Sequence, residues 1–136
     1  KKAEKGIQLS GLGFFNCEAK GTISKLLCYK ESKLHGMGLF ATTTISANTD
    51  LHITHIHSRS IKNYSGPCDW INIIPNCMFN HSETNCNCTI KTEKRGTEDD
   101  RTKHLVTTKD IREGEELLFD YTTDEDLEQP EKDWLV

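Results

Sequence analysis

The chain has 136 residues, of which 35% are hydrophobic, and it carries 21 acidic and 17 basic side chains for a formal net charge of −4. This length fits one domain with a modest core, and the charge balance lacks the basic excess typical of nucleic-acid-binding domains. The longest apolar stretches fall far short of the roughly 20 residues that a membrane-spanning helix needs, so we expect neither a membrane span nor direct binding to nucleic acid.

The predicted elements begin with an irregular segment. Residues 1–25 contain several glycines and no hydrophobic period, so we expect a lead-in before the core. From residue 26 onward, short apolar runs rich in Ile, Leu, Thr and Phe alternate with turn residues, as is typical of strands. The runs are Leu26–Tyr29, Gly38–Ala41, Leu51–His57, Cys88–Thr92, Leu105–Thr108 and Leu117–Tyr121. The sequence therefore predicts a mainly β fold with short helices.

Polar and helical segments interrupt these strands. Lys94–Lys103 is almost wholly charged or polar, so we expect an exposed hairpin loop. Two short helices are predicted, one over Cys68–Ile74 and one after Tyr121, where Thr122–Glu125 has a capping-box pattern. The apolar end Trp134–Val136 is expected to dock back onto the body.

The negative charge is concentrated in the last part of the chain. Residues 109–136 hold 11 acidic and 3 basic side chains, a net charge of −8, which leaves +4 for residues 1–108. This acidic end is either a solvated face that keeps the protein soluble or a rim that attracts a basic partner. Both interpretations can hold at once.

Six cysteines are many for an intracellular domain, and they lie at Cys17, Cys28, Cys68, Cys77, Cys86 and Cys88. Their spacings match no disulfide scaffold. Cys77, Cys86 and Cys88 come nearest to a metal pattern, but a structural zinc site takes four ligands in paired short spacings. Free, mostly buried thiols are the preferred interpretation, and disulfides or zinc are the alternatives.

Three polar motifs are candidates for a functional site. His35-Gly36-Met37-Gly38 is a two-glycine turn, at which a backbone can approach a ligand closely. Asn80-His81-Ser82 offers amide and imidazole hydrogen bonds to a polar ligand. Gly114–Tyr121 is a glycine turn followed by a strand that ends in tyrosine. Each motif taken alone also fits an ordinary turn or loop.

In this order and spacing, the three motifs together resemble the SET-domain protein lysine methyltransferases. The resemblance rests on Lys33–Ala41, on Met78–Ser82 with Asn85 and Cys86, and on Gly114–Tyr121, and it covers roughly residues 26–121. It implies the SET fold, in which small curved β-sheets are combined with a knot-like threading of the C-terminal part. The implied single domain has a lead-in at residues 1–25, a core at 26–121 and a lid segment at 122–136.

The resemblance also implies a site for S-adenosylmethionine (SAM) and for a substrate lysine. The glycine turn would contact the cofactor mainly through its backbone, and the Asn-His pair would also hold it. Tyr121 would place its hydroxyl at the point of methyl transfer, and a phenylalanine at position 119 is associated with the addition of more than one methyl group. The implied cofactor-binding residues are His35, Gly36, Met37, Gly38, Asn80, His81 and Trp134, and the implied catalytic residues are Tyr121 and Phe119.

The chain departs from many family members in its cysteines. No cysteine follows Tyr121, and Asn80–Cys86 is one residue short of the spacing of the zinc-binding members. A minimal domain without the flanking zinc modules is therefore implied. The acidic segment that ends in Trp134 then becomes the candidate to close the pocket over the adenine, as in zinc-free members, and plain core packing of Trp134 is the alternative.

A second departure is a histidine-rich strand with His52, His55 and His57. His55 and His57 share a strand face, which is compatible with a metal site. No third ligand is evident, so we expect a solvated or partner-facing strand face and no metal.

The primary hypothesis is a methyltransferase that moves a methyl group from SAM to the ε-amine of a lysine in a protein, leaving S-adenosyl-L-homocysteine. A histone tail would suit the acidic end of the chain, and so would any basic peptide. The alternatives are a non-catalytic interaction module with the same fold and a cysteine-rich zinc module for nucleic acid. We expect an intracellular protein, nuclear if the substrate is a histone and otherwise in the cytoplasm or a host cell.

Overall fold

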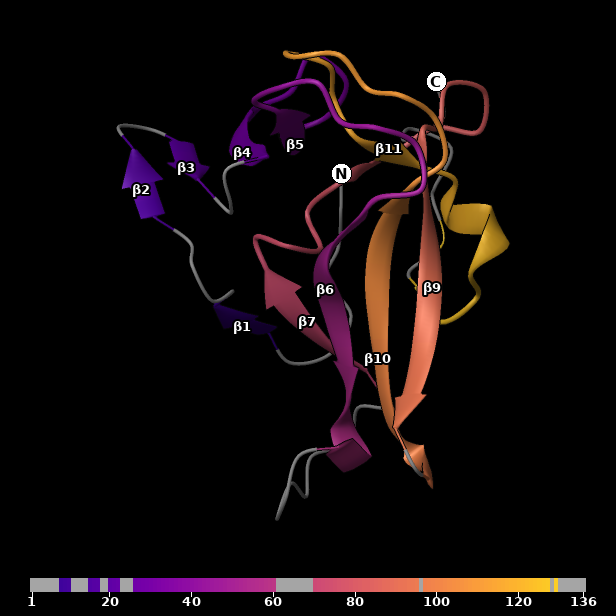
Figure 1. The fold of residues 1–136 in the computed structure, drawn as a ribbon. Coiled ribbons are helices and arrows are strands. Elements are labelled where there is room, and N and C mark those ends of the chain that lie inside the picture. The colour runs from indigo at the N-terminus through magenta and orange to yellow at the C-terminus, as the bar shows by residue number, and fades with distance from the viewer. Residues whose placement is uncertain are drawn as a thin grey trace.

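The computed structural model describes residues 26–60, 70–95, 97–127 and 129, together with the backbone of three short strands before residue 26. Strands dominate these residues (Figure 1), which confirms the predicted mainly β fold. The strands are β1 (Gln8–Ser10), β2 (Phe15–Cys17), β3 (Lys20–Thr22), β4 (Leu27–Glu31), β5 (Met37–Ala41), β6 (Asp50–His57), β7 (Trp70–Ile74), β8 (Asn80–His81), β9 (Cys88–Arg95), β10 (Thr97–Thr107) and β11 (Leu118–Phe119). Two single-turn 3-10 helices accompany them, η1 (Ser58–Ser60) and η2 (Tyr121–Thr123).

The strands form two sheets. The larger has the order β1-β7-β6-β10-β9-β11-β8, and the smaller has the order β2-β3-β4-β5. Strands β6, β10 and β9 are antiparallel neighbours, and Figure 1 shows β9 and β10 as a long hairpin. Strand β11 lies between β8 and β9 and is parallel to both. The knot-like threading of the C-terminal part stays a prediction.

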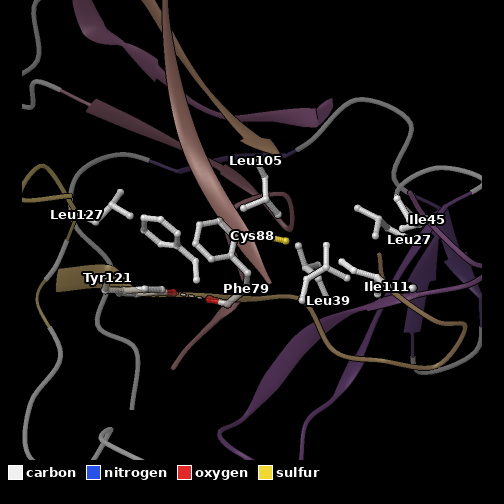
Figure 2. Packing of buried hydrophobic residues seen from close by; sticks show 12 residues of the cluster. Leu27, Leu39, Ile45, Phe79, Cys88, Leu105, Ile111, Tyr121 and Leu127 are labelled. Atoms are coloured by element: carbon white, nitrogen blue, oxygen red, sulfur yellow. Dashed lines mark hydrogen bonds between the residues drawn. The ribbon is translucent and has the colours of Figure 1, made fainter. Parts of the chain in front are cut away.

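The core lies where the two sheets meet. A bridge joins Phe40 to Glu116 and another joins Ile45 to Ile111, and the Leu117 amide donates to the Leu39 carbonyl at 2.8 Å. Apolar side chains from both sheets fill this region (Figure 2). The cluster contains Leu27, Leu39, Ala41, Ile45, Phe79, Cys88, Leu105, Ile111, Leu117, Phe119, Tyr121 and Leu127. The core thus connects β5, β8 and β11, which carry the candidate motifs.

The structure contradicts several predictions about local structure. Lys94–Lys103 is not an exposed loop, because β9 runs to Arg95, β10 starts at Thr97, and Thr102 and Lys103 are buried. The predicted helix at Cys68–Ile74 is wrong over Trp70–Ile74, which is strand β7. Its β-branched isoleucines favour an extended backbone between β1 and β6. The lead-in is not wholly irregular, because it contains β1, β2 and β3.

The predicted helix after Tyr121 is present but shorter and starts earlier. The N-cap is Asp120, whose side chain accepts from the Thr122 amide, and η2 begins at Tyr121 itself. The predicted capping box at Thr122–Glu125 is therefore wrong. Among the described residues, no helix has the length and apolar character that crossing a membrane requires. Trp134–Val136 and the proposed docking of that end lie outside the described residues.

Candidate functional site

Tyr121 is fixed at both its backbone and its hydroxyl. Its amide donates to His81 Nδ1 at 3.0 Å, and its hydroxyl donates to the Phe79 carbonyl, as the dashed line in Figure 2 shows. The tyrosine ring lies in edge contact with Phe79 and His81, at centroid distances of 5.7 Å and 5.5 Å, and 6.0 Å from Phe119. A buried tyrosine held in this way can present its oxygen to a ligand in one defined orientation.

Strand pairing brings this tyrosine to the Asn-His motif, which lies 40 residues earlier in the chain. In the parallel pair of β8 and β11, Leu118 is opposite Asn80 and Phe119 is opposite His81. The Ser82 amide extends the contact by donating to the Phe119 carbonyl at 3.1 Å. Two motifs that lie about 40 residues apart in the sequence therefore meet in one site.

Two buried polar atoms of this site have no hydrogen-bond partner among the described residues, Asn80 Oδ1 and His81 Nε2. His81 Nδ1 accepts from the Tyr121 amide, so the proton of the neutral ring is on Nε2. The pair thus offers one acceptor and one donor. An unsatisfied buried polar group costs about 1–3 kcal/mol, and a polar ligand would remove that cost. An acceptor beside a donor fits a ligand that carries both an amino and a carboxylate group, as SAM does.

The glycine turn approaches the same site from the smaller sheet. Gly36 has φ +51° and open space around the position of a Cβ, so its backbone is accessible to a ligand. A Cβ at Gly38 would overlap Glu116 Oε2 and would lie 3.0 Å from Asn80 Nδ2. Gly38 is therefore needed for packing against Glu116, a role that the sequence analysis did not foresee.

Glu116 is a site residue that sequence reasoning missed. Its Oε1 accepts from Ser32 Oγ at 2.7 Å, and its Oε2 accepts from Asn80 Nδ2 at 2.6 Å. Asn80 Nδ2 also donates to the Met37 carbonyl at 3.3 Å. The position of Glu116 directly before the apolar strand does not single it out. The neighbouring Glu115 is exposed, and nothing in the sequence distinguishes the two.

The structure thus brings most of the predicted residues together. Met37, Gly38, Asn80, His81, Phe119 and Tyr121 are linked by the contacts above. His35 is half-buried in the turn before β5, and the Gly36 carbonyl in that turn accepts from the Ser32 amide at 2.7 Å. Trp134 lies outside the described residues, so its role as a lid stays a prediction.

One cluster in this region has the composition of a metal site. Among the described residues, His81, Glu83 and Asp120 are the group whose potential ligand atoms converge. Because His81 Nδ1 accepts from the Tyr121 amide and Nε2 therefore carries the proton, the ring has no lone pair to offer a metal in this arrangement. Cys77, Cys86 and Cys88 do not converge into such a group.

The histidine-rich strand β6 does not present the predicted solvated face. His55 and His57 are both buried, with 4% and 5% of their surface exposed. Burial, and next the charge of Lys103, lower the pKa of His55 to about 3, so the ring is neutral. His55 Nδ1 lies 2.7 Å from Thr54 Oγ1, and the Thr54 hydroxyl donates to the Lys103 carbonyl at 3.3 Å. Internal contacts therefore replace the expected solvent or partner.

The described cysteines are free thiols, which confirms that part of the prediction. Cys88 is buried, whereas Cys28, Cys77 and Cys86 are only half-buried, so the expectation of mostly buried thiols is wrong. Burial, with a smaller effect of Cys86, raises the pKa of Cys88 to about 12. This thiol is part of the core and not a nucleophile.

Comparisons with known proteins point to one family. A family model described as the SET domain matches residues 52–122, which is more than half of the chain. A search of curated proteins gave no match. Among solved structures, a proposed histone methyltransferase of Plasmodium falciparum has a TM-score of 0.58 at 22% identity, over 73% of this chain and 95% of that chain.

Two further structures support the same fold. The Chaetomium thermophilum Polycomb Repressive Complex 2 bound to S-adenosylmethionine gives a TM-score of 0.54 at 21% identity, over 72% of this chain and 15% of that chain. A SET8 protein from Cryptosporidium gives a TM-score of 0.51 at 20% identity, over 68% of this chain and 56% of that chain. At these identities the structures establish the fold, and together with the match over residues 52–122 they show that this chain belongs to the SET-domain family.

Proposed function

We propose that this SET domain is a SAM-dependent protein-lysine N-methyltransferase. The observation that carries the proposal is the arrangement of Tyr121, whose amide and hydroxyl are both fixed, beside the unpartnered Asn80 Oδ1 and His81 Nε2. The solved structures of similar fold include one protein named as a proposed histone methyltransferase and one complex bound to S-adenosylmethionine, which supports this choice of reaction and cofactor.

The cofactor would be held by groups that the protein leaves unused. Asn80 Oδ1 would accept a hydrogen bond, His81 Nε2 would donate one, and the accessible backbone at Gly36 would contact the ligand directly. When bound, SAM supplies a methyl group on a sulfonium, so that the amine nitrogen gains the bond to carbon as the carbon–sulfur bond breaks. The proton that the substrate ammonium must first lose goes to water.

The substrate amine needs help to lose that proton. With an ordinary pKa of about 10.4, a lysine requires roughly 4–5 kcal/mol to become neutral at pH 7. The rings of Phe79, Phe119 and Tyr121 pack against one another in a buried cluster, and an amine beside them would be poorly hydrated. Such desolvation disfavours the ammonium and lowers its pKa.

Tyr121 acts as an orienting group in this proposal. Its hydroxyl proton is committed to the Phe79 carbonyl, so the oxygen lone pairs face any group placed next to it. Methyl transfer needs the nitrogen, the methyl carbon and the sulfur nearly in line, which is a positioning task more than an acid–base task. The tyrosine therefore needs no change of protonation during the reaction.

The number of methyl groups would depend on Phe119. This side chain carries no hydroxyl, and its ring packs edge-on against Phe79 at 5.8 Å and beside Tyr121. A tyrosine at this position would place a hydroxyl next to the amine and leave less room for a second methyl group. We propose that the wild type adds more than one methyl group and that Phe119→Tyr shifts the product towards monomethyl-lysine.

The test is incubation with labelled SAM and a panel of histones and cell lysate, followed by mass spectrometry of the labelled lysine. Tyr121→Phe should reduce transfer by about 100-fold or more. Tyr29→Phe, which removes a hydroxyl from β4, is the matched control and should retain activity. Binding of SAM without transfer to any substrate would favour the non-catalytic module, and absence of both binding and transfer would refute the proposal.

A further inference from the structure

Lys103, on the central strand β10, holds an ammonium group inside the protein. Only 2% of its surface is exposed, and its Nζ lies 2.8 Å from Asp124 Oδ2 and 3.1 Å from Asp126 Oδ2. The same Nζ lies 4.6 Å from the centre of the Trp70 ring. A charge this deep persists only with compensating partners. His55, opposite Lys103 in the strand register, is neutral and supplies no charge.

Both carboxylates belong to the segment that directly follows Tyr121. Asp124 is the C-cap of η2, and its amide donates to the Tyr121 carbonyl. The Leu127 amide donates to the Asp124 carbonyl at 3.1 Å, and the Leu127 side chain is buried in the core. Gln129 Nε2 lies 3.1 Å from the carbonyls of Tyr121, Asp124 and Leu127. Residues 121–127 and Gln129 are therefore one compact unit attached to the sheet.

Lys103 lies at the place where this unit meets the sheet. Lys103 and Leu105 are two residues apart in the part of β10 that pairs regularly with β9, so their side chains lie on the same face of the sheet. Leu105 belongs to the cluster that contains Tyr121 and Leu127 (Figure 2). The chain after Tyr121, drawn in yellow in Figure 1, lies beyond β9. The ion pairs thus add a polar attachment to the apolar one that Leu127 makes.

We propose that Lys103 is a positioning residue that fixes Tyr121 in place by attaching the following segment to β10 through Asp124 and Asp126. The proposal rests on the function assigned to Tyr121 above. Lys103 itself touches no atom that reacts. Its effect passes along the backbone from Asp124 to η2, and so to the hydroxyl on the Phe79 carbonyl.

The burial of the partners predicts what happens when the attachment is broken. The side chains of Asp124 and Asp126 are 15% and 49% exposed, so both carboxylates can reach water if the segment moves outward. Lys103 is on the central strand and cannot follow them. Replacing Lys103 with methionine should therefore release residues 121–127 while leaving the sheet intact.

Amide hydrogen exchange followed by NMR tests this without any enzymatic readout. In Lys103→Met, the Tyr121 and Leu127 amides should exchange at least about tenfold faster than in the wild type, while the Leu105 amide stays unchanged. Lys103→Arg should restore slow exchange because it keeps the charge. The double variant Asp124→Asn/Asp126→Asn should reproduce the exchange pattern of Lys103→Met. If Lys103→Met does not fold, the double variant is used in its place. Lys91→Met, at an exposed position of β9, is the matched control.

Kinetics then link the attachment to the reaction. Lys103→Met should lower kcat at least about tenfold and change the KM for the protein substrate less than threefold, because Tyr121 orients the amine without binding the rest of the substrate. Uniformly faster exchange in β10 and in residues 121–127, or no change at Tyr121, would overturn the positioning role. An inactive wild type with the local exchange pattern intact would overturn the proposed function and leave the attachment established.

Discussion

Substitution of Gly38 by alanine tests how closely the glycine turn packs against the site. The added Cβ would overlap Glu116 Oε2 and would lie 3.0 Å from Asn80 Nδ2. Glu116 cannot yield freely, because its two oxygens accept from Ser32 Oγ at 2.7 Å and from Asn80 Nδ2 at 2.6 Å. The clash therefore forces the carboxylate to give up at least one hydrogen bond.

The structure sets the size of the effect. A hydrogen bond to a charged group contributes about 1.5–3 kcal/mol, and Glu116 is only half-buried, so we expect Gly38→Ala to destabilise the fold by about 2 kcal/mol. For a domain of this size the loss corresponds to a fall in Tm of about 8 °C. Urea unfolding monitored by circular dichroism gives the free energy, and calorimetry gives the Tm.

A double-mutant cycle with Glu116→Ala separates this clash from other causes. Without the carboxylate, the same change at Gly38 should cost less than about 0.5 kcal/mol. Gly36→Ala is the matched control, since its Cβ meets open space and its cost of about 1 kcal/mol comes from φ +51° alone. That cost should be the same with and without Glu116. An equal loss for Gly38→Ala in both backgrounds would refute the reasoning.

Two further predictions concern buried titratable groups. The pKa of His55 is about 3 in the folded protein and about 6.5 when unfolded, so the unfolded chain binds the extra proton between these values. The free energy of unfolding should therefore fall by up to about 1.4 kcal/mol per pH unit as the pH drops from 6.5 towards 3. In His55→Asn this dependence on pH should be weaker, as measured by urea unfolding at a series of pH values. Burial raises the pKa of Cys88 to about 12, so iodoacetamide at pH 8 should modify Cys28, Cys77 and Cys86 well before Cys88 in the folded protein. Modification of Cys88 at an equal rate, by peptide mass spectrometry, would contradict its placement in the core.

Local patterns in the sequence predicted the apolar parts of the strands but not the polar end of the β9–β10 hairpin. Leu51–His57 and Cys88–Thr92 carry apolar and β-branched residues, and both are strands in the structure. Lys94–Lys103 has the composition of a loop, yet most of it pairs between β9 and β10. Backbone hydrogen bonds to the partner strand stabilise this stretch, and composition alone carries no information about the partner.

In the candidate site, too, some residues could be predicted from sequence motifs, whereas others depend on contacts between distant parts of the chain. Asn80, His81 and Tyr121 were named from the order of the motifs, and parallel pairing of β8 with β11 then joined them. Glu116 and Lys103 were not named, because their roles depend on contacts across 36 and 21 residues of chain. A carboxylate or an ammonium in a sequence of mixed charge has no local feature that predicts its burial.

The acidic end of the chain illustrates how contacts between distant residues change a functional interpretation based on composition. Composition left two interpretations, a solvated face and a rim for a basic partner. The structure adds a third, because Asp124 and Asp126 are paired with the buried Lys103. Charges committed to an internal ion pair contribute little to the attraction of a distant substrate, whereas the exposed Glu125 between them remains available. Neutralising Asp124 and Asp126 should therefore act mainly on kcat, and neutralising Glu125 mainly on the rate of substrate association and its dependence on salt.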